Sequence, residues 1–291
     1  MKAPPFSYVR AASLADAFKL WSEAGPEAKL LAGGQSLLAT LAFRLSEPST
    51  LVDISRVPEL AGIVQASGVI RVGALTTHAE LGASELVRRH VPLLAQAVPL
   101  IAHAAIRNRG TIGGSLAFAD PAAELPACCV ALDAMVVACK AAGERRIPAS
   151  EFFTGLYGTA LAPGELIAAV EFPVARAGER AVILELARRS GDYAMAGIAA
   201  RAKVAGSVLV EPSLVFFGVG ERPVTAMGAM AAIAGRMVKT ETVAAAQAAL
   251  ETDLDPPADQ HGSPEMKLHL ARVLLARALY SIADSEGARA A

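Results

Sequence analysis

The spacing of hydrophobic residues along the chain alternates between a helical period and a strand period. Apolar residues three or four positions apart predict amphipathic helices most clearly at 13–21 and 265–283, and Ser13 occupies the N-cap position of the first. Further helices are predicted at 37–45, 77–81, 92–103, 126–131, 148–153 and 240–250. Strands are predicted at 29–32, 50–54, 63–65, 69–74, 134–139, 165–172, 182–187, 194–204 and 209–218.

The order of these elements indicates an α+β protein that divides after Pro173. We expect an N-terminal domain over 1–175, built from lobes at about 1–55 and 56–175, and a plausible linker at 175–179. A smaller α+β domain is expected at 178–286. Its three strands are predicted to form an antiparallel sheet, followed by two Ala-rich helices.

Composition narrows the classes of function. The chain has 291 residues and is 54 % hydrophobic, yet no apolar run reaches the ~20 residues that cross a bilayer. The N-terminus lacks the apolar core of a signal peptide. A net charge of −1 gives nucleic acid no long-range attraction. We therefore expect a cytoplasmic protein without a membrane span or a nucleic-acid partner.

The three cysteines, Cys128, Cys129 and Cys139, lie in one apolar stretch. Their odd number and the adjacent pair argue against a disulfide framework, and their spacing suits neither zinc nor an iron–sulfur cluster. We expect buried thiols and no metal site in this chain.

Two glycine-rich segments carry the candidate chemistry. The first glycine loop (33–36, Gly-Gly-Gln-Ser) lies between a predicted strand and a predicted helix, where free N–H groups bind anions and glycine permits close approach of a ligand. Taken alone, Gly-Gly before a helix is more often only a turn. The second glycine loop (108–115, Asn-Arg-Gly-Thr-Ile-Gly-Gly-Ser) opens a long segment to Glu124 that we expect to be largely non-helical, and loops of this length are usually functional.

These loops belong to neither common nucleotide-binding class. No Gly-x-Gly-x-x-Gly follows the first strand, and no Gly-Lys-Ser/Thr marks a P-loop. Rossmann and P-loop enzymes are therefore disfavoured.

Residues 32–36 (Ala-Gly-Gly-Gln-Ser) together with 111–115 (Thr-Ile-Gly-Gly-Ser) resemble the two FAD signatures of molybdenum-hydroxylase flavoproteins. This family comprises the FAD-binding medium subunits of aerobic carbon monoxide dehydrogenase and of xanthine dehydrogenase-like enzymes. Looser similarity follows in the family's order along nearly the whole chain, at 43–45, 51–54, 71–76, 106–110, 191–194 and 262–267.

The resemblance implies a two-lobed FAD-binding domain of the vanillyl-alcohol-oxidase (PCMH) type, followed by a domain like the C-terminal domain of the carbon monoxide dehydrogenase flavoprotein. It implies that FAD relays electrons from iron–sulfur clusters of a partner to an external acceptor. The partners would be a large molybdopterin-binding subunit and a small [2Fe-2S] subunit, in a dimer of heterotrimers. No catalytic side chain is expected here.

The same resemblance assigns cofactor-binding roles by motif. Residues 29–36 would contact the FAD diphosphate and ribityl region, and Glu124 would bind cofactor hydroxyls. Ile101 and Leu166 would pack against the flavin or adenine, and Tyr193 would lie near the isoalloxazine. The full expected set is Lys29, Leu30, Leu31, Ala32, Gly33, Gly34, Gln35, Ser36, Ile101, Thr111, Gly113, Gly114, Ser115, Glu124, Leu166 and Tyr193.

The chain departs from the family pattern at two positions. Ser115 stands where members commonly have Asn, and Glu185 falls near a position often occupied by Lys. A carboxylate there would oppose an anionic reduced flavin, which leaves the flavin potential open. Tyr193 has a second interpretation as a core aromatic, and Arg188 with Arg189 forms either a subunit contact or a cofactor contact.

Two other functions remain open at this point. The chain could be a stand-alone FAD-dependent oxidase or reductase, although no substrate domain or proton donor is identifiable. It could also be a non-enzymatic module whose glycine loops are only turns. The sequence names neither the substrate of the assembly nor the electron acceptor.

Overall fold

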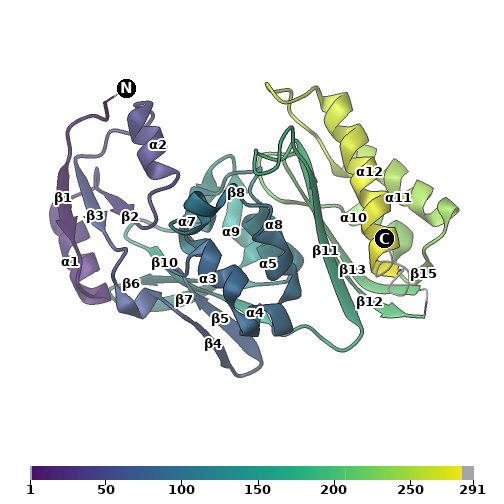
Figure 1. Ribbon diagram of the computed structural model, residues 1–291, viewed down its shortest axis with the longest axis horizontal. Helices are drawn as coiled ribbons and strands as arrows, with labels where there is room; N and C mark the ends of the chain where they lie inside the picture. Colours follow the sequence, from purple (N-terminus) through teal and green to yellow (C-terminus); the bar gives the residue numbers. More distant parts are fainter. Residues whose placement is uncertain (1, 207, 284–291) are drawn as a thin grey trace.

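The computed structural model describes residues 2–206 and 208–283, whose three larger sheets are arranged in a row with helices between and beside them (Figure 1). The first sheet is parallel, in the order β1 (Ser7–Arg10), β3 (Thr50–Asp53), β2 (Lys29–Leu31). Helices α1 (Leu14–Ala24) and α2 (Leu37–Ala42) connect its strands. Helix α1 begins as predicted, because the Ser13 side chain accepts a hydrogen bond from the Asp16 amide.

The middle sheet is antiparallel. Its order is β4 (Ile63–Ala66), β5 (Val69–Gly73), β10 (Leu166–Pro173), β6 (Met135–Lys140), β7 (Gly143–Pro148). A short helix, η1 (Pro58–Leu60), precedes it. The helices that accompany the middle sheet are α3 (His78–Ala83), α4 (Glu85–His90), α5 (Pro92–Ala97), α6 (Ala104–Arg107), α7 (Ile112–Phe118), α8 (Glu124–Ala131) and α9 (Ala149–Phe152). Strands β8 (Phe153–Gly155) and β9 (Gly158–Thr159) form a small separate hairpin.

The third sheet contains the three predicted long strands, β11 (Glu179–Leu186), β12 (Ala196–Ala205) and β13 (Val208–Phe217), paired antiparallel. Two strands of two residues each, β14 (Val224–Thr225) and β15 (Arg236–Met237), pair with β13 and were not predicted. Helices α10 (Met227–Ile233), α11 (Thr240–Asp253) and α12 (Pro264–Ala283) cover one face of this sheet (Figure 1).

Alternating side chains of β13 serve two different hydrophobic cores. Val215 and Phe217 join the core of the middle layer, which consists of the middle sheet and helices α3 to α9. Leu214 and Phe216 join the core under α10, α11 and α12. Successive residues of a strand point to opposite faces, so a continuous apolar run here marks a sheet that is covered on both sides. A third core joins the middle sheet to the N-terminal layer, which consists of the first sheet with helices α1 and α2.

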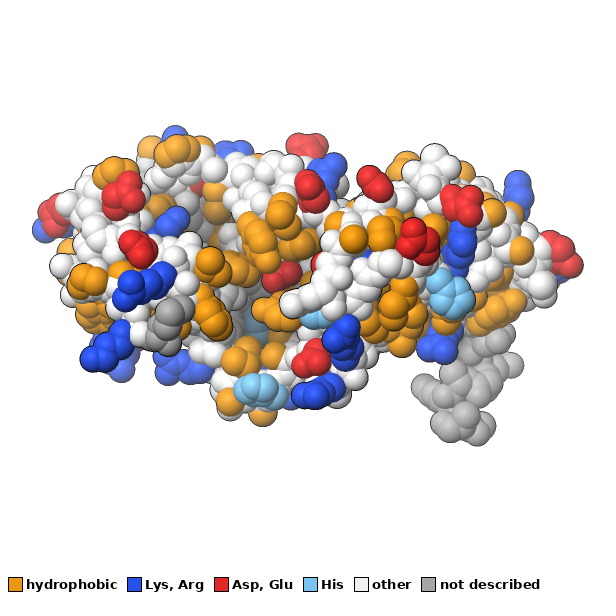
Figure 2. Space-filling view, turned by 90° about the horizontal axis from the view of Figure 1, so that it is seen from above, with side chains coloured by type: hydrophobic (Ala, Val, Ile, Leu, Met, Phe, Trp, Pro, Cys, Tyr) orange, Lys and Arg blue, Asp and Glu red, His pale blue; other side chains and the backbone are white. Residues whose placement is uncertain are grey.

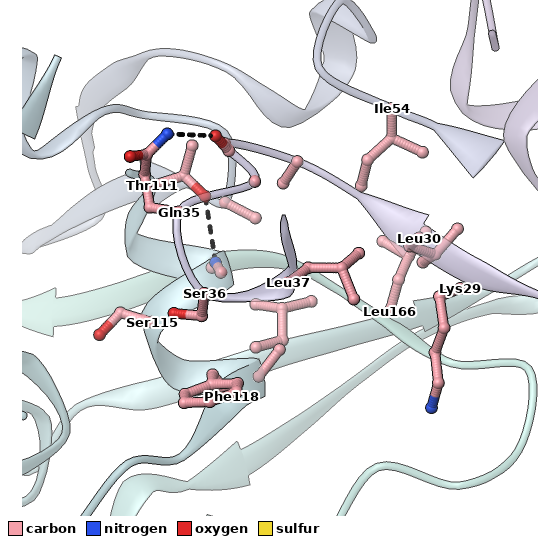
Figure 3. A pocket seen from close by; sticks show the side chains of 18 of the residues that line it. Lys29, Leu30, Gln35, Ser36, Leu37, Ile54, Thr111, Ser115, Phe118 and Leu166 are labelled. Carbon is pink, nitrogen blue, oxygen red and sulfur yellow. Dashed lines mark hydrogen bonds between the residues drawn. The ribbon is translucent and has the colours of Figure 1, made fainter. Parts of the chain in front are cut away.

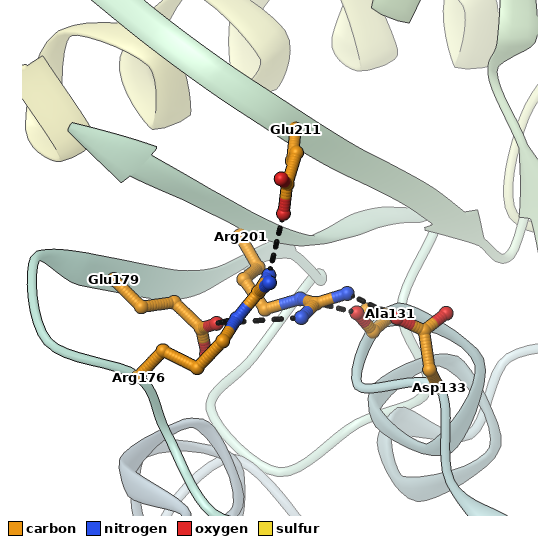
Figure 4. Close-up of polar contacts among 6 residues, drawn as sticks. All are labelled: Ala131, Asp133, Arg176, Glu179, Arg201 and Glu211. Carbon is orange, nitrogen blue, oxygen red and sulfur yellow. Dashed lines mark hydrogen bonds and ion pairs between the residues drawn. The ribbon is translucent and has the colours of Figure 1, made fainter. Parts of the chain in front are cut away.

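A polar network fastens the third sheet to the middle layer (Figure 4). Arg201 of β12 donates to the carbonyl of Ala131 at the end of α8, pairs with Asp133, and contacts Glu179 at 3.4 Å. Arg176 approaches Glu179 from the connecting segment. The Arg201 side chain is only 11 % exposed and that of Glu179 only 7 %, so these charges depend on one another.

Two predictions of local structure were wrong. The helix expected at 92–103 ends at Ala97, and Ala102 adopts a left-handed conformation with φ of 41°. The segment from Asn108 to Glu124, expected to be largely non-helical, contains α7. Strands β1 and β7 and helices α4, α6 and α10 were not predicted, whereas the expected burial of the three cysteines is confirmed. In the described residues, no helix combines the length and apolar character that a membrane span needs.

Candidate functional site

A large cleft lies between the N-terminal layer and the middle layer. Its volume is about 1360 Å³, and its walls come from β2, the first glycine loop, α7 and the start of β10. The space-filling view shows the hollow, with hydrophobic side chains gathered around it (Figure 2). A ligand in this cleft would touch segments that are far apart in the sequence.

The first glycine loop presents unused backbone donors to the cleft. Gly34 has φ of +74°, and the Gln35 side-chain amide donates to the Gly33 carbonyl at 3.0 Å, which holds the turn (Figure 3). Within the described residues, the amide N–H groups of 33–37 have no acceptor. Such a run of free N–H groups at the start of a helix suits an anionic ligand.

The second glycine loop is different because its donors are already used. Thr111 caps α7 by accepting a hydrogen bond from the Gly114 amide at 3.1 Å. The amides of Ile112 and Gly113 donate to the carbonyls of Thr76 and Ala74. This loop can line a ligand, but the start of α7 has few free N–H donors for an anion.

The glycines of both loops are needed because backbones pack closely there. A Cβ atom on Gly33 would lie 2.0 Å from the Arg109 carbonyl oxygen, so the two loops touch at this point. A Cβ atom on Gly113 would lie 2.5 Å from the Cβ of Ala74. Neither position accepts a larger residue without moving a cleft wall.

Apolar side chains line much of the remaining wall. Leu30, Ile54 and Leu166 gather in one part of the cleft, away from Ser115 and Phe118 (Figure 3). Lys29 is exposed at the side of Leu30 and Leu166. These surfaces suit flat, apolar ring systems that flank a polar centre.

Acidic groups with perturbed ionisation lie in and beside another part of the cleft: Asp120 and Glu124 line it, and Glu185 acts on Glu124 without lining it. Burial raises the pKa of Glu124 to about 8, and repulsion from Glu185 and Asp120 adds to this. Burial also raises the pKa of Glu185 to about 7, and its Oε2 atom has no hydrogen-bond partner in the described residues. Burial and then the nearby carboxyls Asp120 and Glu124 raise the pKa of Tyr193.

The structure brings together almost all the residues predicted for the site. Every one of them lines the cleft except Leu31, whose side chain packs beneath Gly34. Tyr193 is 62 % exposed, so its interpretation as a core aromatic was wrong. Arg188 and Arg189 are exposed and do not line the cleft.

Sequence reasoning missed several lining residues. Trp21 and Phe18 lie on the apolar face of the helix predicted at 13–21, and Phe118 lay in the segment predicted to be largely non-helical. His78 follows an N-cap threonine and gave no signal of its own. Asp120 accepts a hydrogen bond from the Ala122 amide and holds the turn before α8, although it does not cap that helix.

Comparisons with known proteins give the same picture over nearly the whole chain. The family described as the FAD binding domain in molybdopterin dehydrogenase matches residues 4–175, and the CO dehydrogenase flavoprotein C-terminal domain matches residues 182–282. The chain is 41 % identical to the 6-hydroxypseudooxynicotine dehydrogenase complex subunit alpha of Paenarthrobacter nicotinovorans, over 96 % of this chain and 95 % of that protein.

Two solved structures are also similar. One is the carbon monoxide dehydrogenase of Hydrogenophaga pseudoflava, with a TM-score of 0.94 and 36 % identity over 97 % of this chain and 98 % of the other. The second is quinoline 2-oxidoreductase of Pseudomonas putida 86, with a TM-score of 0.93 and 38 % identity at the same coverage. The chain therefore belongs to the family of FAD-binding subunits of the molybdopterin dehydrogenases that includes the medium chain of carbon monoxide dehydrogenase.

Proposed function

We propose that this protein is the FAD-carrying electron-transfer subunit of a molybdopterin-dependent hydroxylase or dehydrogenase. One observation carries the proposal: a single cleft joins the free N–H groups of 33–37 to the wall formed by α7. Family membership supports FAD as the cofactor of this cleft. Bound FAD supplies the redox chemistry, taking up electrons from a partner subunit and passing them to an external acceptor.

The residues of the cleft fit FAD at three levels. The free N–H groups of the first glycine loop suit the diphosphate, and the absence of a Cβ atom on Gly33 keeps the two loops in contact. The apolar wall at Leu30 and Leu166 suits a ring system, and so does the exposed ring of Tyr193. Ser115 and Glu124 supply polar contacts within reach of the cleft.

The architecture we propose has an FAD-binding domain of the PCMH type over 1–175, with lobes at about 1–55 and 56–175, and a C-terminal domain over 178–286. The sheet memberships support this division, because the first sheet ends at Asp53 and the third begins at Glu179. The last residues of the C-terminal range, 284–286, lie outside the described residues.

We further propose a cytoplasmic assembly with a large molybdopterin-binding subunit and a small [2Fe-2S] subunit, arranged as a dimer of heterotrimers. Support comes from the relatives' names, which include a dehydrogenase complex subunit and medium chains. A substrate-oxidising centre would then lie in another chain, so the substrate is a property of the partner.

Purification with an affinity tag from the native host tests this assignment. The expected result is one FAD per chain, together with two further chains, molybdenum and iron. A yellow protein that purifies alone and reduces oxygen without partners would instead identify a stand-alone oxidase. A colourless protein that takes up no added FAD would refute both assignments.

A further inference from the structure

His78 is a buried polar side chain whose ring makes no well-formed hydrogen bond within the part of the chain that the structure describes. It is the first residue of α3 and only 5 % exposed, yet it lines the cleft. Neither its Nδ1 nor its Nε2 atom makes a hydrogen bond of normal geometry with the described residues, and the Thr111 backbone gives the ring only a contact too poorly aligned to count as one. Buried polar atoms are nearly always paired, so an unpaired ring on a ligand cleft points to a partner that comes with the ligand.

Three contacts place this ring behind the first glycine loop. The backbone amide of His78 donates to the Gly110 carbonyl at 2.9 Å. A Cβ atom on Gly110 would lie 3.1 Å from Cε1 and 3.2 Å from Nδ1 of His78. Gly110 in turn touches the first loop, because a Cβ atom on Gly33 would lie 3.0 Å from its Cα.

The local charge favours an anion at this position. Arg107 is the charged side chain that acts on His78, and its guanidinium is held by the carbonyls of Ile101 and Ala102. Burial lowers the pKa of His78 to about 4; the Thr111 backbone opposes this shift and Arg107 adds to it, so the ring is neutral near pH 7. A neutral imidazole carries one N–H donor and one acceptor.

We propose that His78 is a phosphate-binding residue of the cleft, whose ring N–H donates to a phosphoryl oxygen of a diphosphate directly or through one water. The diphosphate would be held between this N–H and the free amides of 33–37. The inference rests on the proposed FAD function and adds a residue to it. The partner recognised is a phosphoryl oxygen, which belongs to FAD or to free pyrophosphate.

Binding titrations on the FAD-depleted chain test the role of His78. We expect His78→Leu to weaken binding of FAD and of ADP about tenfold or more, and to leave riboflavin binding unchanged because riboflavin has no phosphate. His78→Gln retains an N–H donor and is expected to recover most of the affinity. His269→Leu, on the exposed face of α12, is the matched control and should bind all three ligands like the wild type.

Nitrogen NMR of the His78 ring gives a second measurement that needs no variant. Addition of ADP or inorganic pyrophosphate is expected to shift the ring signals and to raise the ring pKa, because a nearby anion favours the protonated form. A response to ADP without one to pyrophosphate means that the nucleotide positions the phosphate and supports the proposal. Ring signals and a ring pKa that respond to neither would overturn it.

The outcomes separate the two proposals. A folded His78→Leu chain that binds FAD and ADP like the wild type would overturn the role of His78 and leave the FAD function intact. An equal loss for ADP and riboflavin would show a packing role and would also overturn it. A wild-type chain that binds no FAD would refute both proposals.

Discussion

Substitution of Glu124 by glutamine should change how the stability of the protein depends on pH. Glu124 begins α8 at the wall of the cleft, and its pKa is raised to about 8. A raised pKa means that the neutral form is the one that suits the folded protein. Its contribution to stability is therefore complete below the unfolded value near 4.5 and is lost as the pH rises through the folded value near 8.

The size of the effect follows from the difference between the pKa of Glu124 in the unfolded chain and its pKa in the folded protein. Each pH unit between the two pKa values lowers the free energy of unfolding by about 1.4 kcal/mol for one group. Between about pH 5.5 and about pH 7.5, Glu124 alone accounts for roughly 2–3 kcal/mol. Glu185, with a pKa raised to about 7, adds a second contribution of the same sign.

Urea unfolding of the FAD-free chain at several pH values measures this directly. Glu124→Gln keeps the shape of the side chain and removes the ionisation, so its free energy of unfolding should fall less steeply with pH than that of the wild type. Glu171→Gln is the matched control. Ion pairs with Arg146 and Arg71 lower the pKa of Glu171, so it is ionised in both states above about pH 5 and its removal leaves the slope unchanged. A Glu124→Gln chain with the wild-type slope would refute the reasoning.

Three further substitutions test other parts of the structure. Gly33→Ala forces the first glycine loop away from the Arg109 carbonyl and should weaken FAD binding at least about tenfold in a fluorescence titration; unchanged affinity would contradict the contact. Arg201→Met removes the hydrogen bond to the Ala131 carbonyl and leaves Glu179 with only the exposed Arg176, so it should cost about 2 kcal/mol in urea unfolding. A loss below about 1 kcal/mol would show that the network contributes little to stability. Thr111→Val removes the N-cap of α7 and should cost about 1 kcal/mol in the same assay, with no loss expected only if the cap does not form.

The elements with strong periodicity were predictable because burial of one apolar face determines their conformation. Helix α1 combines an amphipathic face with the Ser13 cap, and β11, β12 and β13 each contain an apolar stretch of strand length. Helix α7 was not predictable in the same way. Its Gly-Gly-Ser start has low helix propensity, and long-range hydrogen bonds from Ile112 to Thr76 and from Gly113 to Ala74 hold it.

The site was predictable where residues stand in motifs and invisible where the fold brings single residues together. Both glycine loops were recognised from the sequence and line the same cleft. Trp21 has helical spacing; it packs against the third core and also lines the cleft, and the spacing alone does not reveal the second role. The His78 ring packs against Gly110, which is distant in sequence, so its position in the cleft could not be read from the chain.

Equilibrium titration of the purified wild-type chain with FAD, followed by the change in flavin fluorescence, tests the central claim most directly. We expect saturable binding of one FAD per chain and competition by ADP, because the free amides of 33–37 are proposed to hold the diphosphate. Absence of FAD binding by a folded chain would contradict it.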